Sequence, residues 1–184
     1  MVATRNVALA SAILLYSGTA VAQSFRLGVD LASLIPAGDF EIVPYSKLGG
    51  IGFGALLRLE VLTPAGFSFT ARSGYIQHLT QMGDEPGLSA KFHEVPILVG
   101  AKLYSHTGIY GALEVGATSA TLTASNTRIP ATRSITSFSA SAVLGIGLLT
   151  GPVDFQLSLR SVDVSRLTNT LEFGFSVGFN ALSL

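Results

Sequence analysis

The sequence predicts an all-β fold, an eight-stranded antiparallel up-and-down β-barrel that crosses a membrane. Three observations predict it. Bulky apolar residues alternate with small or polar residues along eight long segments, which is the period of a β-strand. Short and long connections between the segments alternate. Charged residues make up only 12% of the chain and mean hydropathy is +0.54, yet no apolar run after residue 22 has the length of a membrane helix.

The N-terminal segment has the layout of a secretory signal peptide. Arg5 supplies a positive charge, residues 7–16 form an apolar core, and Ala20-Val21-Ala22 offers small residues for cleavage. We therefore expect residues 1–22 to be a signal peptide and residues 23–184 to be one barrel domain. The chain has no cysteine, which excludes disulfides and a lipid-modified N-terminal cysteine. Its formal net charge of zero argues against a nucleic-acid partner.

Four strands are predicted in the first half of the barrel domain. Each has bulky apolar residues at one parity and glycine, hydroxyl or charged residues at the other. The expected strands are 25–34, whose apolar face begins at Phe25; 50–62 and 67–77, joined by Thr63-Pro64-Ala65-Gly66; and 92–104, whose apolar face includes Val95, Ile97 and Val99.

Four more strands follow in the second half and keep the same alternation. The expected strands are 109–118, with Leu113 and Val115 on the apolar face; 136–149, with Phe138, Leu144 and Ile146; 153–164, with Phe155 and Leu157; and 170–180, with Phe173, Phe175 and Phe179. About ten residues at ~3.3 Å each, tilted by ~40°, rise roughly 25 Å, which matches the apolar band of an outer-membrane barrel.

The connections indicate how the barrel is oriented. Long connections are expected at 35–47, 79–91 and 120–135, short ones at 63–65, 105–108 and 150–152, and an intermediate one at 165–169. Outer-membrane barrels have short turns on the periplasmic side and longer loops outside the cell. We therefore predict that both termini are periplasmic and that the long loops are extracellular.

Alternation alone does not say which face of the sheet is outside, because soluble ligand-binding barrels alternate with the apolar face inward. The interior of eight strands is only just wide enough for side chains to fill, so the phenylalanine, leucine and isoleucine ladders would overfill it. The opposite face consists mostly of Gly, Ser, Ala and Thr, and it has too few charges for a water-exposed exterior. We therefore predict that the apolar face contacts lipid.

The predicted inner face carries nearly balanced charges. An unpaired buried charge costs several kcal/mol, so we predict a cross-strand salt-bridge network in the middle of the barrel. The expected members are Arg26, Asp30, Arg58, Glu60, Arg72, Glu94, Lys102, Glu114, Asp154, Arg160 and Glu172.

Two adjacent segments resemble a known family. Residues 94–104, EVPILVGAKLY, and 108–116, GIYGALEVG, resemble the central strands of small eight-stranded outer-membrane β-barrels of the OmpX and OmpA transmembrane-domain type, including porin-family β-barrel domains. LSLR at 157–160 followed by LTN at 167–169 resembles the penultimate strand and last loop of that group. The resemblance covers the whole mature chain. It implies location in a bacterial outer membrane, contact with its lipid and insertion by the barrel-assembly machinery.

The C-terminus departs from this group, whose members usually end on an aromatic residue that the assembly machinery recognises. Here the aromatic ladder stops at Phe179, and Leu182 and Leu184 lie on the opposite parity. Either a bulge shifts the register or the terminal signal is weak.

No catalytic, cofactor or metal site is predicted. The sequence contains no GxSxG, HExxH, phosphate-binding loop or cysteine nucleophile. His78 and His93 flank the long loop that holds Asp84 and Glu85, and His106 is in a short turn. A metal or pH-sensing site at the loop rim is one interpretation of these residues, but solvated rim residues are the preferred one.

The function that follows is a non-enzymatic outer-membrane scaffold whose loops serve interaction or adhesion, because recognition usually resides in loops on a rigid scaffold. The expected partners are outer-membrane lipid, the barrel-assembly machinery and extracellular or periplasmic proteins. One alternative is a narrow channel for ions or small solutes, which conductance would reveal. The other is a lipid-modifying enzyme, for which His78 and Thr80 are the nearest residues, without the serine that such enzymes use.

Overall fold

The structure is a computed structural model that describes residues 24–37, 50–79, 88–126, 131–165 and 170–183. The expected signal peptide, residues 1–22, lies outside the described residues, as do Thr80, Asp84 and Glu85. No helix among the described residues has the length and hydropathy that crossing a membrane requires.

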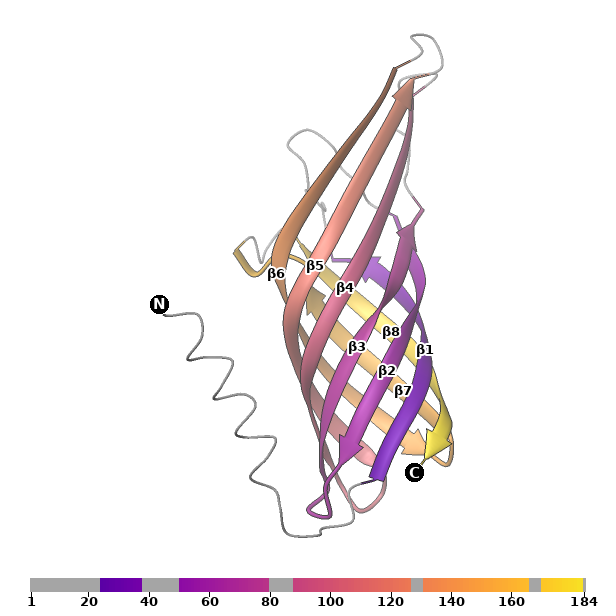
Figure 1. Ribbon diagram of the computed structural model, residues 1–184, viewed down its shortest axis with the longest axis vertical. Coiled ribbons are helices and arrows are strands. Elements are labelled where there is room, and N and C mark those ends of the chain that lie inside the picture. Colours follow the sequence, from indigo (N-terminus) through magenta and orange to yellow (C-terminus); the bar gives the residue numbers. More distant parts are fainter. Residues whose placement is uncertain (1–23, 38–49, 80–87, 127–130, 166–169, 184) are drawn as a thin grey trace.

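Eight antiparallel strands form one closed barrel in which every strand pairs with its neighbours in sequence and the first pairs with the last (Figure 1). The fold class predicted from the sequence is therefore confirmed. The strands are β1 Ser24–Pro36, β2 Gly52–Leu62, β3 Phe67–His78, β4 Leu88–Tyr104, β5 Ile109–Asn126, β6 Ala131–Thr150, β7 Val153–Ser161 and β8 Leu171–Ser183.

The three short turns lie at one end of the barrel, together with the start of β1 and the end of β8 (Figure 1). We call this the turn end and the opposite end the loop end. Gly66 and Gly108 have φ angles of 74° and 84°, a left-handed conformation that costs other residues about 1–2 kcal/mol. The two glycines therefore allow the β2–β3 and β4–β5 turns to be tight.

The central strands are longer than the sequence predicted. The expected connections at 79–91 and 120–135 are wrong in part, because β4 begins at Leu88, β5 continues to Asn126 and β6 begins at Ala131. Threonine and serine supply about half of the added residues of β5 and β6, and threonine is common in strands. Their hydroxyls also pair across the strands, with 3.0 Å between Thr121 and Thr136 Oγ1. The apolar alternation used for prediction does not extend into this hydroxyl-rich sheet.

The two faces of the barrel lie as predicted. Leu57 on β2 is 58% exposed on the outside, whereas Arg58, the next residue, is 1% exposed. Ile51, Val99 and Phe155 are also exposed, and Glu94 and Arg160 are buried. The apolar outer face ends at one level on three neighbouring strands, because Val95, Ser119 and Phe138 are register partners and polar residues follow each toward the loop end. We call the exposed apolar surface below this level the apolar band.

The register of the C-terminus resolves the alternative left open by the sequence. β8 contains an irregularity opposite Leu27 and Gly28, where Gly28 pairs with Asn180 and Leu27 pairs with Leu182. The extra residue moves Leu182 to the outer face, where it is exposed like Phe179. A β-bulge, which is a common device at strand ends, therefore accounts for the change of parity.

Candidate functional site: the charged interior

The charged side chains predicted to face inward lie inside the barrel wall. All of them except Arg26 are buried, and Arg26 is partly exposed near the turn end. They come from all the strands except β6, and each of these seven strands contributes one or two of them. Their ion pairs form two clusters, one near the turn end and one near the loop end.

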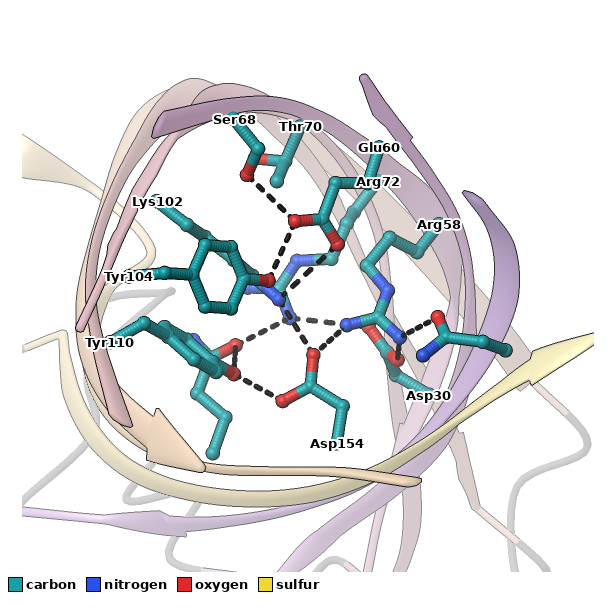
Figure 2. A network of polar contacts seen from close by, with 12 residues as sticks. Asp30, Arg58, Glu60, Ser68, Thr70, Arg72, Lys102, Tyr104, Tyr110 and Asp154 are labelled. Carbon is teal, nitrogen blue, oxygen red and sulfur yellow. Dashed lines mark hydrogen bonds and ion pairs between the residues drawn. The ribbon is translucent and has the colours of Figure 1, made fainter. Parts of the chain in front are cut away.

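The turn-end cluster is centred on Asp154 of β7 (Figure 2). Its carboxylate accepts hydrogen bonds from the Arg58 guanidinium, from Lys102 Nζ at 2.6 Å and from the Tyr110 hydroxyl. Arg58 also lies 3.4 Å from Asp30 Oδ1. Two cations and two carboxylates from four strands therefore neutralise one another, as a buried charge requires.

Arg72 of β3 extends this cluster across the barrel. Its guanidinium forms a hydrogen-bonded ion pair with Glu114 of β5 and lies 3.5 Å from Asp30 Oδ2. Thr70 Oγ1 donates a further hydrogen bond of 3.1 Å to Glu114. Glu114 thus has two protein donors, which satisfies a carboxylate that is nearly inaccessible to water.

Glu60, Tyr104 and Tyr110 complete this cluster (Figure 2). Ser68 Oγ and the Tyr104 hydroxyl donate to Glu60 Oε1 at 2.7 and 2.6 Å, and Lys102 Nζ is 3.8 Å from Glu60 Oε2. Lys102 Nζ also lies 4.3 Å from the Tyr110 ring centroid, within the range of a cation–π contact.

Glycines on the inward face give these side chains their room. A Cβ atom at Gly178 would overlap Asp30 Oδ1 and lie 2.9 Å from the Arg58 guanidinium. A Cβ atom at Gly28 would be 3.1 Å from the same guanidinium. Gly28 and Gly178 are therefore a packing requirement of the Arg58–Asp30 ion pair.

The loop-end cluster contains Glu94 of β4, Arg160 of β7 and Glu172 of β8. Arg160 holds one oxygen of each carboxylate, at 2.6 Å from Glu94 Oε2 and 3.4 Å from Glu172 Oε2. Arg160 also donates to Thr118 Oγ1 at 3.1 Å. This cluster has two carboxylates but only one arginine.

His78 is a member of the loop-end cluster that sequence reasoning missed. Interpreting it as a solvated rim residue was wrong: it is buried at the end of β3, and its Nε2 lies 3.2 Å from Glu94 Oε1 and 3.8 Å from Glu172 Oε1. His93, in contrast, is partly exposed and stacks on Tyr75 with 5.3 Å between ring centroids. The sequence feature that could have identified His78 is its position in the alternation of β3, because it falls on the same inward-facing side as Arg72.

Apolar residues separate the two clusters. Leu34, Leu56 and Ile76 form a buried apolar group on the inward faces of β1 to β3. This group lines a cavity of about 30 Å³ together with Arg72 of the turn-end cluster and Arg160 of the loop-end cluster. Arg26 is the predicted network member that the structure leaves apart, since no ion pair of Arg26 occurs among the described residues.

Comparison with known proteins identifies the fold. No protein-family model matches the chain, and no curated protein matches it in sequence. The barrel is similar to the crystal structure of Ail, the attachment invasion locus protein of Yersinia pestis, with a TM-score of 0.56 and 11% identity over 86% of this chain and 95% of that one. It is also similar to Ail in complex with the heparin analogue sucrose octasulfate, with a TM-score of 0.57 and 12% identity over the same shares. The likeness confirms the predicted recognition at the level of the fold, an eight-stranded barrel of the outer-membrane type.

Proposed function

We propose that this chain is a non-enzymatic outer-membrane β-barrel that presents its loop end to partners outside the cell. The observation that carries the proposal is the division of its outer surface. Exposed apolar side chains surround the barrel up to the level of Val95, Ser119 and Phe138, and β4, β5 and β6 continue beyond that level as a polar sheet. An apolar band suits lipid, and a polar sheet above it suits water.

The proposed orientation places the turn end in the periplasm and the loop end outside. Short turns at one end and a projecting sheet at the other are the asymmetry of outer-membrane barrels. The export signal predicted in residues 1–22 supports the same location. Insertion by the barrel-assembly machinery is part of this proposal, and the exposed side chains of Phe179 and Leu182 at the end of β8 are its candidate recognition surface.

We also propose that the interior acts as a structural filling without transport. The ion pairs of Asp154 with Arg58 and Lys102 join β7 to β2 and β4 across the interior, so a solute would have to displace paired charges to pass. Planar bilayers test this part of the proposal. Silent bilayers would support it, and steady conductance by the purified barrel would favour the channel instead.

The projecting sheet indicates a ligand class. We define it as residues 88–91, 119–126 and 131–137, in which Lys91 is exposed and the sequence has no aspartate or glutamate. Hydroxyl groups and positive charge suit a sulfated polysaccharide, since sulfate groups accept hydrogen bonds and attract cations. The similar barrel of Ail has been crystallised with a heparin analogue, which supports trying this ligand class first.

Cysteine labelling tests the orientation, because the natural chain has no cysteine. Thr123→Cys places a thiol on the projecting sheet, and Thr107→Cys places one in the β4–β5 turn. In intact cells a membrane-impermeant maleimide should label the first variant, and it should label the second only after the outer membrane is permeabilised. Labelling in the reverse order would refute the orientation.

Binding to immobilised heparin tests the ligand class, with unsulfated dextran as the matched surface. We expect salt-sensitive retention on heparin alone, because screening weakens exposed charge contacts. Lys91→Gln should reduce retention, whereas Thr107→Gln in the β4–β5 turn should not, because Thr107 lies at the opposite end of the barrel. Equal retention on both surfaces would exclude the sulfated ligand and leave the orientation proposal standing.

A further inference from the structure

We infer that the loop-end cluster is a binding site for a divalent transition-metal ion of the zinc class, held by His78, Glu94 and Glu172. Nε2 of His78 and one carboxylate oxygen from each glutamate lie within 4.8 Å of one another. The three residues come from β3, β4 and β8, so the closed barrel alone brings them together.

The spacing of the three donor atoms suits such an ion. His78 Nε2 lies 3.2 Å from Glu94 Oε1 and 3.8 Å from Glu172 Oε1. Zinc bonds of about 2.0–2.2 Å in a tetrahedron place neighbouring ligand atoms about 3.3–3.6 Å apart. Imidazole nitrogen with carboxylate oxygen is a donor set for first-row divalent ions. Small shifts of the side chains would therefore complete three of the four positions.

The surrounding contacts hold each ligand with its donor atom facing the centre. Arg160 binds the other oxygen, Oε2, of both Glu94 and Glu172, which leaves the two Oε1 atoms facing His78. His78 Nδ1 lies 3.4 Å from the Gly50 carbonyl oxygen. A carbonyl only accepts, so Nδ1 donates to it, and Nε2, which faces Glu94 Oε1, is the nitrogen that would bind the ion after losing any proton it holds. Partners of this kind orient the ligands in known metal sites.

The charge of the cluster provides an independent argument for a bound cation. Glu172 is 0% exposed, and its Oε1 accepts no hydrogen bond from any described residue. Two buried carboxylates with one arginine leave one negative charge uncompensated, which is costly in an interior. A cation between His78 and the two Oε1 atoms would remove that cost. The inward position of Gly52 fits the site, because a Cβ there would lie 2.8 Å from His78 Cε1.

The alternative to a bound metal ion is a proton shared by His78 and the carboxylates. Titration with zinc distinguishes these two possibilities. The probe is zinc(II) added to the untagged, folded chain in detergent after EDTA treatment, followed by isothermal titration calorimetry at neutral pH. We expect saturable binding of one zinc per chain. His78→Gln and Glu172→Gln should each weaken it by more than tenfold, because removal of mere supporting partners already costs about 10–100-fold.

The matched variant leaves the buried cluster intact. The chain has three histidines, and His93→Gln with His106→Gln removes the two that lie outside the cluster. This double variant should bind zinc as the wild type does, and X-ray absorption at the zinc edge should show one imidazole ligand. That result supports the site even where His78→Gln fails to fold.

Three outcomes would overturn the inference. The first is the absence of stoichiometric zinc binding to the folded wild type, which would leave a proton as the occupant. The second is loss of binding in the double variant, which would place the ion at the exposed histidines. The third is unchanged binding in folded His78→Gln. None of these outcomes affects the orientation test, so the metal site and the proposed function are tested separately.

Discussion

Replacing Lys102 with methionine tests whether the ion pairs of the interior stabilise the barrel. Lys102 lies on β4 and is 0% exposed. Its Nζ is 2.6 Å from Asp154 Oδ2 and 3.8 Å from Glu60 Oε2. Methionine has nearly the same length and volume, so the substitution removes the charge while it keeps most of the packing.

The expected loss follows from these distances. At an effective dielectric constant of about 20, attraction across 2.6 Å is worth about 6 kcal/mol and attraction across 3.8 Å about 4 kcal/mol. Desolvation of the lysine, which the methionine variant avoids, offsets several kcal/mol of that attraction. Removing one partner from a buried ion pair therefore lowers the free energy of unfolding by about 3–5 kcal/mol.

Lys91→Met is the matched control, because it makes the same change on the same strand at an exposed position. Urea unfolding from phospholipid vesicles, followed by the mobility of the unheated protein in SDS gels, gives the free energy for each variant. We expect Lys91→Met to change it by no more than about 0.5 kcal/mol. If the two variants differ by less than about 1 kcal/mol, the interior ion pairs contribute no specific stability.

Four more substitutions, one of them a control, test other parts of the fold by the same unfolding assay. Gly178→Ala should cost about 1–3 kcal/mol, because its Cβ would overlap Asp30 Oδ1, and an unchanged stability would refute this packing. Leu57→Arg on the apolar band should cost about 2–4 kcal/mol in vesicles, whereas Thr123→Arg on the projecting sheet should be tolerated; equal costs would refute the assigned band. Gly108→Ala should cost about 1–2 kcal/mol because of its left-handed φ of 84°, and a neutral effect would contradict that turn conformation.

The fold could be predicted from the sequence because two constraints act together on each strand. Alternation with a period of two decides which residues share a face, as for Leu57 and Arg58. The small interior of eight strands then decides which face is outside, because bulky ladders do not fit within it. Both constraints are local or depend on strand number alone, so neither requires knowledge of which strands are neighbours across the barrel.

The ends of the central strands could not be predicted in the same way. Residues 119–126 of β5 carry small or hydroxyl side chains at most positions, and the outer face of the sheet above the apolar band is polar. There the strand is held by backbone pairing with β4 and β6 and by hydroxyl contacts such as Thr123 with Ser134 at 3.2 Å. Pairing with β4 and β6, rather than side-chain hydrophobicity, extends β5. The sequence of one strand does not show which strands will pair with it, so this extension could not be predicted.

Parity could predict which strand residues face the interior, but it could not predict how their charged side chains group into clusters. Parity placed Glu94, Arg160 and Glu172 on the inner face without saying which cation reaches which carboxylate. That choice depends on register and strand tilt, which bring Arg160 on β7 to Glu94 on β4 although 66 residues separate them in the numbering. The same geometry adds His78, which occupies the inward parity at the very end of β3.

The position of Arg58 links the charge network to the closure of the barrel. Arg58 lies on β2 and contacts Asp30 on β1, Asp154 on β7 and the Asn180 side chain on β8. Its partners Asp154 and Asn180 are 96 and 122 residues away in sequence, so they reach it only when β8 pairs with β1. Before the barrel closes, Arg58 can pair with Asp30 on the neighbouring strand, but Asp154 has no contact with Arg58. Closing the sheet therefore neutralises charges that an open sheet would leave exposed to lipid or unpaired, which favours the closed barrel over any unclosed arrangement of the same strands.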